Sequence, residues 1–144
     1  MTKEEAIERM LSIQQVLDKG MTRSLSQLMK ALYAEYGEYL QLVKGEWAWW
    51  LRDGKQFIVR DNAEVAEEAI DVLHFWLSIR NFIRSTGTMN DVPVCLVDAP
   101  NLCLRHLRSW DQVYSEYVKK ARINLERWGR NPAEIDHLVG EAYL

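Results

Sequence analysis

The sequence is poor in helix-breaking residues, in cysteine and in net charge. Only 3 of its 144 residues are proline and 7 are glycine, and no glycine lies between Gly54 and Gly87. The 2 cysteines, Cys95 and Cys103, lack CxxC spacing, which argues against a zinc site and fits buried thiols in a reducing cytoplasm. No apolar run approaches the length of about 18 residues that predicts a membrane span. A formal net charge of −3 argues against a general nucleic-acid-binding protein. The charged N-terminus does not have the pattern of a signal peptide, so we expect a cytoplasmic protein.

A hydrophobic fraction of 48% can supply one core, and we expect a single domain over residues 1–144. Long segments without helix breakers carry apolar residues at helical spacing, which predicts an all-α bundle of four to five helices. Two capping boxes are expected, at Thr2 with Glu5 and at Ser24 with Gln27. The expected helices span residues 3–19, 25–51, 63–84, 102–128 and 133–142. Glycine and proline interrupt the pattern near residues 86–100, which predicts a long loop with a β-branched run that suits a short strand.

Acidic residues fall on helix faces that are otherwise largely apolar. At about 100° per residue, Glu35 lies almost opposite the polar sector of the second expected helix, and Glu38 lies about 60° from Glu35. The acidic residues that share one face of the third expected helix are Glu64, Glu68 and Asp71. The solvated side of that helix is expected to carry Glu67, His74 and Ser78. Two acidic pairs with i,i+3 spacing therefore converge if the two helices pack in antiparallel fashion.

Four converging carboxylates predict a cation among them, because like charges at close range destabilise a fold. A set of oxygen ligands selects Mg²⁺, with Mn²⁺ as the alternative. A di-iron site would need Glu-x-x-His motifs, and the nearest match, Asp71 with His74, has its histidine on the polar side. The structural alternative is that Lys or Arg from other helices pairs with the acids. The predicted metal ligands are Glu35, Glu38, Glu68 and Asp71, and Glu35 and Glu38 are the candidate general bases.

The fourth expected helix carries a polar stripe. Tyr117, Lys120, Asn124 and Arg127 fall within about 80° of one another. Opposite a carboxylate–Mg²⁺ cluster, two cations and an amide suit a polyphosphate. The alternative is an ordinary solvated helix face.

Two further residues are candidates for contact with a base. Gln14 lies among apolar neighbours, where its amide could offer one donor and one acceptor to a uracil edge. The alternative is a glutamine at the edge of the core. Trp50 or Trp47 could stack on the base, although most of the six tryptophans should serve packing.

Several segments together resemble the dimeric all-α dUTPase family, within the MazG-like all-α nucleoside triphosphate pyrophosphatases. Glu35-x-x-Glu38 and Glu68-x-x-Asp71 are similar to the family's ExxE and ExxD motifs. The other similar segments are Ile13-Gln14-Gln15-Val16-Leu17-Asp18, Asp71-Val72-Leu73-His74-Phe75-Trp76-Leu77-Ser78 and Tyr117-x-x-Lys120-x-x-x-Asn124-x-x-Arg127. Lys55 with the tryptophans at 47, 49 and 50 resembles the family's FKxW segment only loosely. The sequence departs from the family at Ala121 and Trp128, which affects the outer substrate contacts.

The resemblance implies a homodimer that hydrolyses dUTP to dUMP and pyrophosphate with attack at the α-phosphorus. It also implies a nucleotide substrate held in part by Lys55, Lys120, Asn124 and Arg127. Two alternatives stay open: a related pyrophosphohydrolase acting on dCTP or a modified nucleotide, and a non-catalytic helical interaction protein. No nucleic-acid or membrane partner is expected.

Overall fold

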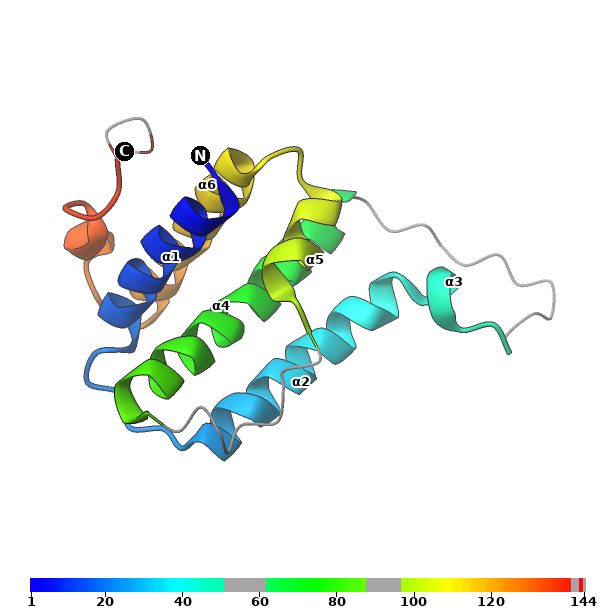
Figure 1. Ribbon diagram of the computed structural model, residues 1–144, viewed down its shortest axis with the longest axis horizontal. Helices are drawn as coiled ribbons and strands as arrows, with labels where there is room; N and C mark the ends of the chain where they lie inside the picture. Colours follow the sequence, from blue (N-terminus) through cyan, green and yellow to red (C-terminus); the bar gives the residue numbers. More distant parts are fainter. Residues whose placement is uncertain (51–61, 88–96, 141–142, 144) are drawn as a thin grey trace.

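The computed structural model describes residues 1–50, 62–87, 97–140 and 143, and over these ranges it contains six α-helices, one 3₁₀ turn and no strand. The elements are α1 (Lys3–Asp18), α2 (Leu25–Leu42), α3 (Lys44–Trp47), α4 (Asn62–Thr86), α5 (Ala99–His106), α6 (Trp110–Arg127) and η1 (Pro132–Ile135) (Figure 1). The predicted all-α class is confirmed. The predicted loop and short strand fall mostly on residues 88–96, outside the described residues. None of the helices in the described ranges has the length and apolar composition of a membrane span.

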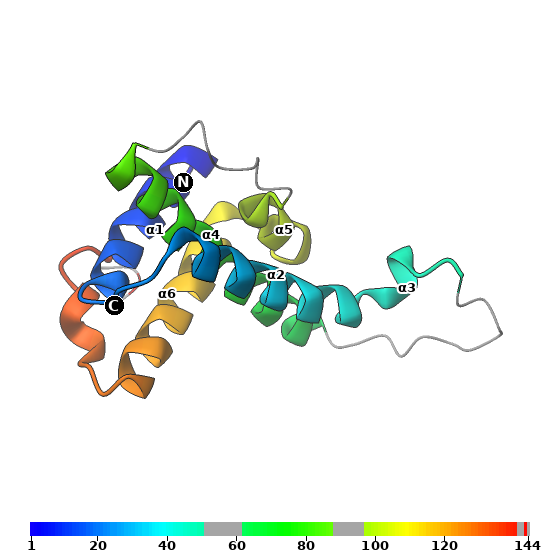
Figure 2. The same ribbon diagram turned by 90° about the horizontal axis from the view of Figure 1, so that it is seen from below.

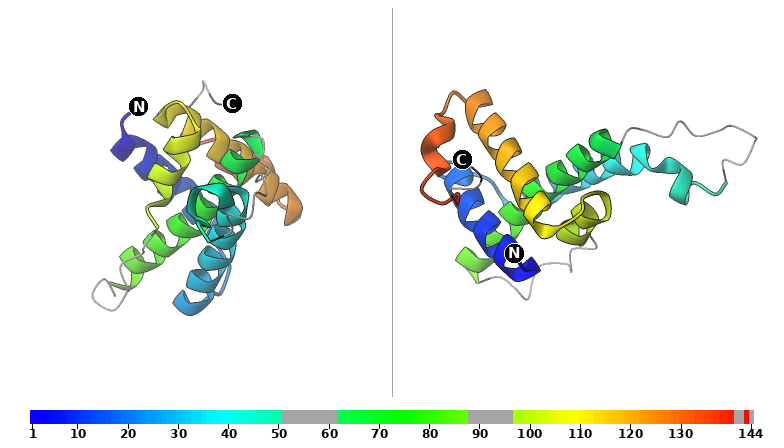
Figure 3. Two further views of the ribbon diagram at one scale, coloured as in Figure 1. Left: turned by 90° about the vertical axis from the view of Figure 1, so that its right-hand side faces the viewer. Right: turned by 90° about the horizontal axis from the view of Figure 1, so that it is seen from above.

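Helix α4 is the centre of the bundle and contacts α1, α2, α5 and α6. It runs antiparallel to α2, while α1 and α6 lie side by side against its other flank (Figure 1). The end of α2 and the short α3 project away from α1 and α6 (Figures 2 and 3). Fully buried side chains from three helices meet in the core, and they include Ile13, Leu17, Leu73, Leu77, Tyr117 and Leu125.

Both predicted capping boxes are present. The Thr2 hydroxyl accepts from the Glu5 amide at 3.1 Å, and the Glu5 carboxylate accepts from the Thr2 amide at 3.4 Å. At α2, the Ser24 hydroxyl and the Gln27 side chain bond reciprocally to the two backbone amides at 3.1 and 2.9 Å. Side chains thereby satisfy amides that a helix start otherwise leaves unpaired.

The second predicted helix is shorter than expected. Helix α2 ends at Leu42, and after Val43 the chain forms the single turn of α3. The Trp47 indole donates to the Leu40 carbonyl at 2.7 Å. That carbonyl is one of the last four in α2 and has no partner within a regular helix, so the folded-back tryptophan stabilises the stop.

The fourth predicted helix is instead two helices, α5 and α6, separated at residues 107–109. The Ser109 hydroxyl accepts from the Gln112 amide at 3.2 Å, and the Gln112 side chain accepts from the Arg108 amide at 2.8 Å. This new N-cap explains the break, because Ser-x-x-Gln favours a helix start over helix continuation. The predicted helix at 133–142 is likewise wrong, since η1 is a single 3₁₀ turn.

The expectation that His74 and Ser78 lie on a solvated side is also wrong. Their exposed fractions are only 6% and 3%. Four helices pack around α4, so this helix has no wholly solvated side along its middle. Cys103 is a buried free thiol, as expected, while Cys95 lies outside the described residues.

Candidate active site

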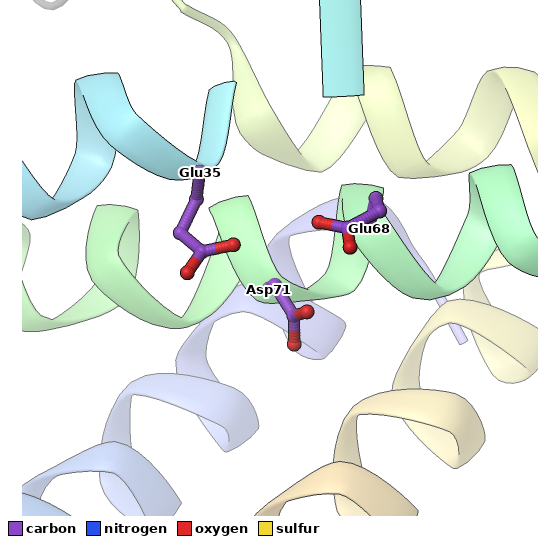
Figure 4. A group of neighbouring side chains, drawn as sticks. All are labelled: Glu35, Glu68 and Asp71. Carbon is purple, nitrogen blue, oxygen red and sulfur yellow. The ribbon is translucent and has the colours of Figure 1, made fainter. Parts of the chain in front are cut away.

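The antiparallel pairing of α2 and α4 brings three predicted carboxylates together. Ligand oxygens of Glu35 from α2 and of Glu68 and Asp71 from α4 all lie within 4.8 Å of one another (Figure 4). Each of the three side chains is partly buried. Glu38, one turn beyond Glu35, is exposed and is not part of this group. Glu64 is exposed as well, so it does not join the cluster that the helical wheel predicted.

Burial and mutual repulsion hold these acids toward their neutral forms. Burial, followed by the charges of Asp71, Glu38 and Glu68, raises the pKa of Glu35 to about 7. Burial and the neighbouring Asp71 and Glu38 raise the pKa of Glu68. Burial raises the pKa of Asp71 although its bond to Lys120 acts in the opposite direction. The Oε2 atom of Glu68 is buried and has no hydrogen-bond partner in the described part of the chain. The cluster therefore holds an excess of negative charge, which is the property of a cation site.

Lys120 of α6 is the one basic side chain in the structure's described ranges that forms an ion pair with this cluster. Its ammonium lies 3.1 Å from Asp71 Oδ1 and 3.4 Å from Glu67 Oε1. The structural alternative, in which basic side chains neutralise the acids, therefore holds for Asp71. It does not extend to Glu35 or Glu68, for which no ion pair is formed among the placed residues.

A cavity of about 200 Å³ lies between α6 and two carboxylates of the cluster, Glu35 and Asp71, whereas Glu68 does not line it. Six of its lining residues were predicted site residues: Gln14, Glu35, Asp71, Lys120, Asn124 and Arg127. The other six are Asp18, Arg23, His74, Phe75, Ser78 and Trp128. Acidic and basic walls thus face one space, which suits a ligand that carries both a metal ion and phosphates.

The α6 stripe divides into two parts. Tyr117 is fully buried, and its hydroxyl bonds inside the core, so it does not reach the cavity. Asn124 and Arg127 line the cavity, and within the described ranges neither side chain forms a hydrogen bond or ion pair. Their donors are therefore available to a ligand.

The predicted base-reading residue, Gln14, is buried and its amide is fully hydrogen-bonded. Its Oε1 accepts from the Tyr117 hydroxyl at 2.7 Å and pairs with His74 Nδ1 at 3.0 Å. Its Nε2 donates to Asp18 Oδ1 and to Ser78 Oγ, each at 3.1 Å. An amide group has two donors and two acceptor sites, so no position remains free for a base.

The predicted aromatic contact of Trp50 does not reach the cavity. Trp50 is 56% exposed, packs against Trp47 and Trp49, and does not line it. Lys55 lies outside the described residues. In contrast, Trp128 lines the cavity and is 45% exposed, although the sequence marked it only as a departure from the family.

His74, Phe75 and Ser78 line the cavity but were not predicted as site residues. The resemblance to the family's D-x-LHF-x-LS segment contained the signal for all three, while the helical wheel placed two of them in solvent. A second cavity, of about 490 Å³, lies between α4, α5 and α6. The described residues that line it include Glu67 and Glu116 but no group of three carboxylates, so we assign the site to the smaller cavity.

The fold and the site define the class of all-α proteins in which acidic motifs on two antiparallel helices face a basic helix. A sequence model of the dUTPase family matches residues 6–99, well over half of the chain, and the protein belongs to this family. The matched segment contains both acidic motifs and Gln14, whereas α6 lies beyond it and contributes Lys120, Asn124 and Arg127 to the cavity wall. No significant match was found among curated proteins or among solved structures.

Proposed function

We propose that this protein hydrolyses dUTP to dUMP and pyrophosphate in the presence of Mg²⁺ and so helps to keep uracil out of DNA. Membership of the dUTPase family supports a nucleotide pyrophosphohydrolase. The observation that carries the finer proposal is the cavity in which Glu35 and Asp71 face Lys120, Asn124 and Arg127. Such a space offers a place for a metal ion beside a chain of phosphates.

The residues present fit a hard divalent cation. Carboxylate oxygens are the ligands that Mg²⁺ prefers, with Mn²⁺ suited to the same set, and three of them already lie within 4.8 Å. The raised pKa values of Glu35, Glu68 and Asp71 report repulsion and burial that a cation would offset. Glu35, Glu68 and Asp71 would hold the ion, and Glu38, which lies outside this group but whose side chain hydrogen-bonds to Glu35, would be a fourth ligand. When bound, Mg²⁺ supplies charge neutralisation for the phosphates and a more acidic water.

Side chains of the protein carry out the other steps of the proposed reaction, namely phosphate binding and proton transfer. Arg127 and Asn124 bind phosphate oxygens through donors that have no partner among the described residues. Lys120 exchanges Asp71 for a phosphate oxygen once the acidic cluster has another source of positive charge. Glu35 or Glu38 accepts the proton of the attacking water, and attack at the α-phosphorus leaves pyrophosphate.

We also propose that the protein acts as a homodimer. Trp49 and Trp50 are 71% and 56% exposed and pack against each other on the projecting end of the α2–α3 segment. A surface with several large apolar side chains suits a protein interface. Light scattering at micromolar concentration tests this, and a monomer would contradict it.

The proposed reaction is tested by pyrophosphate release from a panel of NTPs and dNTPs with and without Mg²⁺. We expect release from dUTP that requires Mg²⁺ or Mn²⁺. A preference for dCTP or a modified base would instead identify a related pyrophosphohydrolase. No release from any nucleotide would favour an interaction protein with structural acids.

A further inference from the structure

The hydrogen bonds around Gln14 determine which nitrogen of the neighbouring His74 carries a proton. The amide nitrogen of Gln14 faces Asp18, whose carboxylate only accepts, so the orientation of the amide is fixed. The opposite atom, Oε1, also only accepts, and it lies 3.0 Å from His74 Nδ1. Nδ1 must therefore carry the hydrogen, and Nε2 is left as a bare acceptor.

Within the described part of the chain, Nε2 of His74 is a buried acceptor without a partner. His74 has an exposed fraction of 6%, and no described residue hydrogen-bonds to its Nε2. Its ring lies against the ring of Tyr117, with centroids 4.5 Å apart. The residue lines the same cavity as Asp71 and Arg127. A buried polar atom with no partner costs free energy. Because His74 belongs to the cavity wall, we infer that a ligand in this cavity supplies the missing donor.

We propose that His74 Nε2 accepts the N3–H of a uracil ring and is the atom that selects this base over cytosine. The inference rests on the proposed function and assigns to His74 the reading of the base that the sequence had suggested for Gln14. Gln14 then acts one step away, as the positioning residue that fixes the tautomer of His74.

The chemistry of the two pyrimidines explains the selection. Uracil carries a hydrogen on N3, whereas cytosine carries a lone pair there, so two acceptors would face each other in a cytosine complex. Burial, and secondarily the charge of Lys120, lowers the pKa of His74 to about 3, which keeps the ring neutral and Nε2 an acceptor near neutral pH. Thymine also has an N3–H, so this contact alone does not exclude thymine.

The direct test is ¹⁵N NMR of the imidazole in the full-length protein, titrated with dUMP, dCMP and N3-methyl-dUMP up to millimolar concentration. We expect an unprotonated Nε2 and a protonated Nδ1 before any ligand is added. Addition of dUMP should move the Nε2 resonance in the direction of hydrogen-bond acceptance, and the other two nucleotides should not. An Nε2 resonance that dUMP leaves unchanged, or that dCMP moves equally, would overturn the proposal.

Two variants separate a ligand contact from a packing role. His74→Phe keeps an aromatic ring beside Tyr117 but removes the acceptor, and we expect the dUMP-to-dCMP affinity ratio to fall roughly tenfold to a hundredfold. His106→Phe is the matched control, because this histidine also lies against a tyrosine ring, that of Tyr39, but does not line the cavity. It should keep the ratio of the unmodified protein. An equal loss of the ratio in both variants would show that the loss of a packed histidine, and not the loss of a ligand contact, determines it.

Hydrolysis of dUTP is measured on the same preparations to separate the two proposals. Hydrolysis without any response of Nε2 to dUMP would reject the role of His74 and leave the reaction standing. A specific response of Nε2 without hydrolysis would leave the base contact standing and reject the proposed reaction.

Discussion

The replacement Glu35→Gln tests whether the acidic cluster is a cation site that weakens the metal-free fold. Glu35 lies with Glu68 and Asp71 inside 4.8 Å, and Lys120 pairs with Asp71 but not with Glu35. A neutral amide of nearly the same shape removes one negative charge from the cluster and leaves the Asp71–Lys120 ion pair in place. We therefore expect Glu35→Gln to stabilise the metal-free protein.

The size of the effect follows from the pKa of Glu35. Burial and neighbouring acids raise this pKa from 4.5 to about 7 in the folded protein. At about 1.36 kcal/mol per pKa unit, the difference corresponds to about 3 kcal/mol. Because the side chain is only part-buried, solvent screening reduces this to about 1–2 kcal/mol. For a chain of this length, that free energy corresponds to a Tm increase of roughly 3–6 °C.

The pH dependence has a definite sign. Between pH 4.5 and about 7 the folded protein holds more protons on Glu35 than the unfolded chain does. Stability therefore falls as the pH rises through this window. Glu35→Gln should match the unmodified protein near pH 4.5 and exceed its stability above pH 7. With Mg²⁺ the order should reverse, because a cation that binds only the folded state stabilises it, and the variant lacks one ligand.

Thermal unfolding with and without Mg²⁺ at several pH values measures both effects, together with dUTP hydrolysis, which the variant should lose. Glu64→Gln is the matched control, since Glu64 lies on the adjoining turn of α4 but is exposed and outside the cluster. Its Tm should stay near that of the unmodified protein at every pH. Equal stability of Glu35→Gln and the unmodified protein above pH 7, with the same response to Mg²⁺, would refute the cation-site reasoning.

Three further predictions concern the phosphates, the buried network and the bond that breaks. Arg127→Ala should weaken the binding of a non-hydrolysable dUTP analogue roughly tenfold to a hundredfold, because a charge-assisted contact contributes about 1.5–3 kcal/mol. The affinity for dUMP should stay nearly unchanged. Equal losses of affinity for both ligands in calorimetry would contradict this prediction. Gln14→Leu should reduce the free energy of unfolding, measured by urea denaturation, by about 1–3 kcal/mol, because it leaves buried donors such as His74 Nδ1 unpaired. The control Gln15→Leu, at an exposed position, should change the free energy of unfolding little. Hydrolysis of dUTP in ¹⁸O-water should place the label in dUMP, and label in pyrophosphate would exclude attack at the α-phosphorus.

Local signals in the sequence were sufficient for the helix starts and for the main carboxylate cluster. The capping boxes at Thr2 and Ser24 involve residues only three positions apart, so a short sequence window contains all of the interaction. Three of the four predicted acids meet because i,i+3 spacing places them on facing sides of α2 and α4. The same logic placed Glu38 with them, although it lies at the exposed edge of the helix pair.

The errors arose where tertiary contacts override helical periodicity. The wheel assigns a solvated side to every helix, but α4 is surrounded, so His74 is buried. Its partner Gln14 is 60 positions away in sequence, and no local pattern predicts that hydrogen bond. The break before α6 was missed because no glycine or proline interrupts residues 102–128, while the hydroxyl of Ser109 in fact caps a new helix.

Lys120 connects the stability of the fold to the proposed reaction. In the structure it bridges Asp71 and Glu67, and thus offsets part of the repulsion that the acidic cluster generates. The same ammonium lines the cavity beside Asn124 and Arg127, where a phosphate would lie. A cation bound among the carboxylates would neutralise Asp71 in place of Lys120. A phosphate bound at α6 would give the released Lys120 ammonium a new partner. Binding of metal and triphosphate should consequently be cooperative, since each ligand makes the exchange less costly for the other.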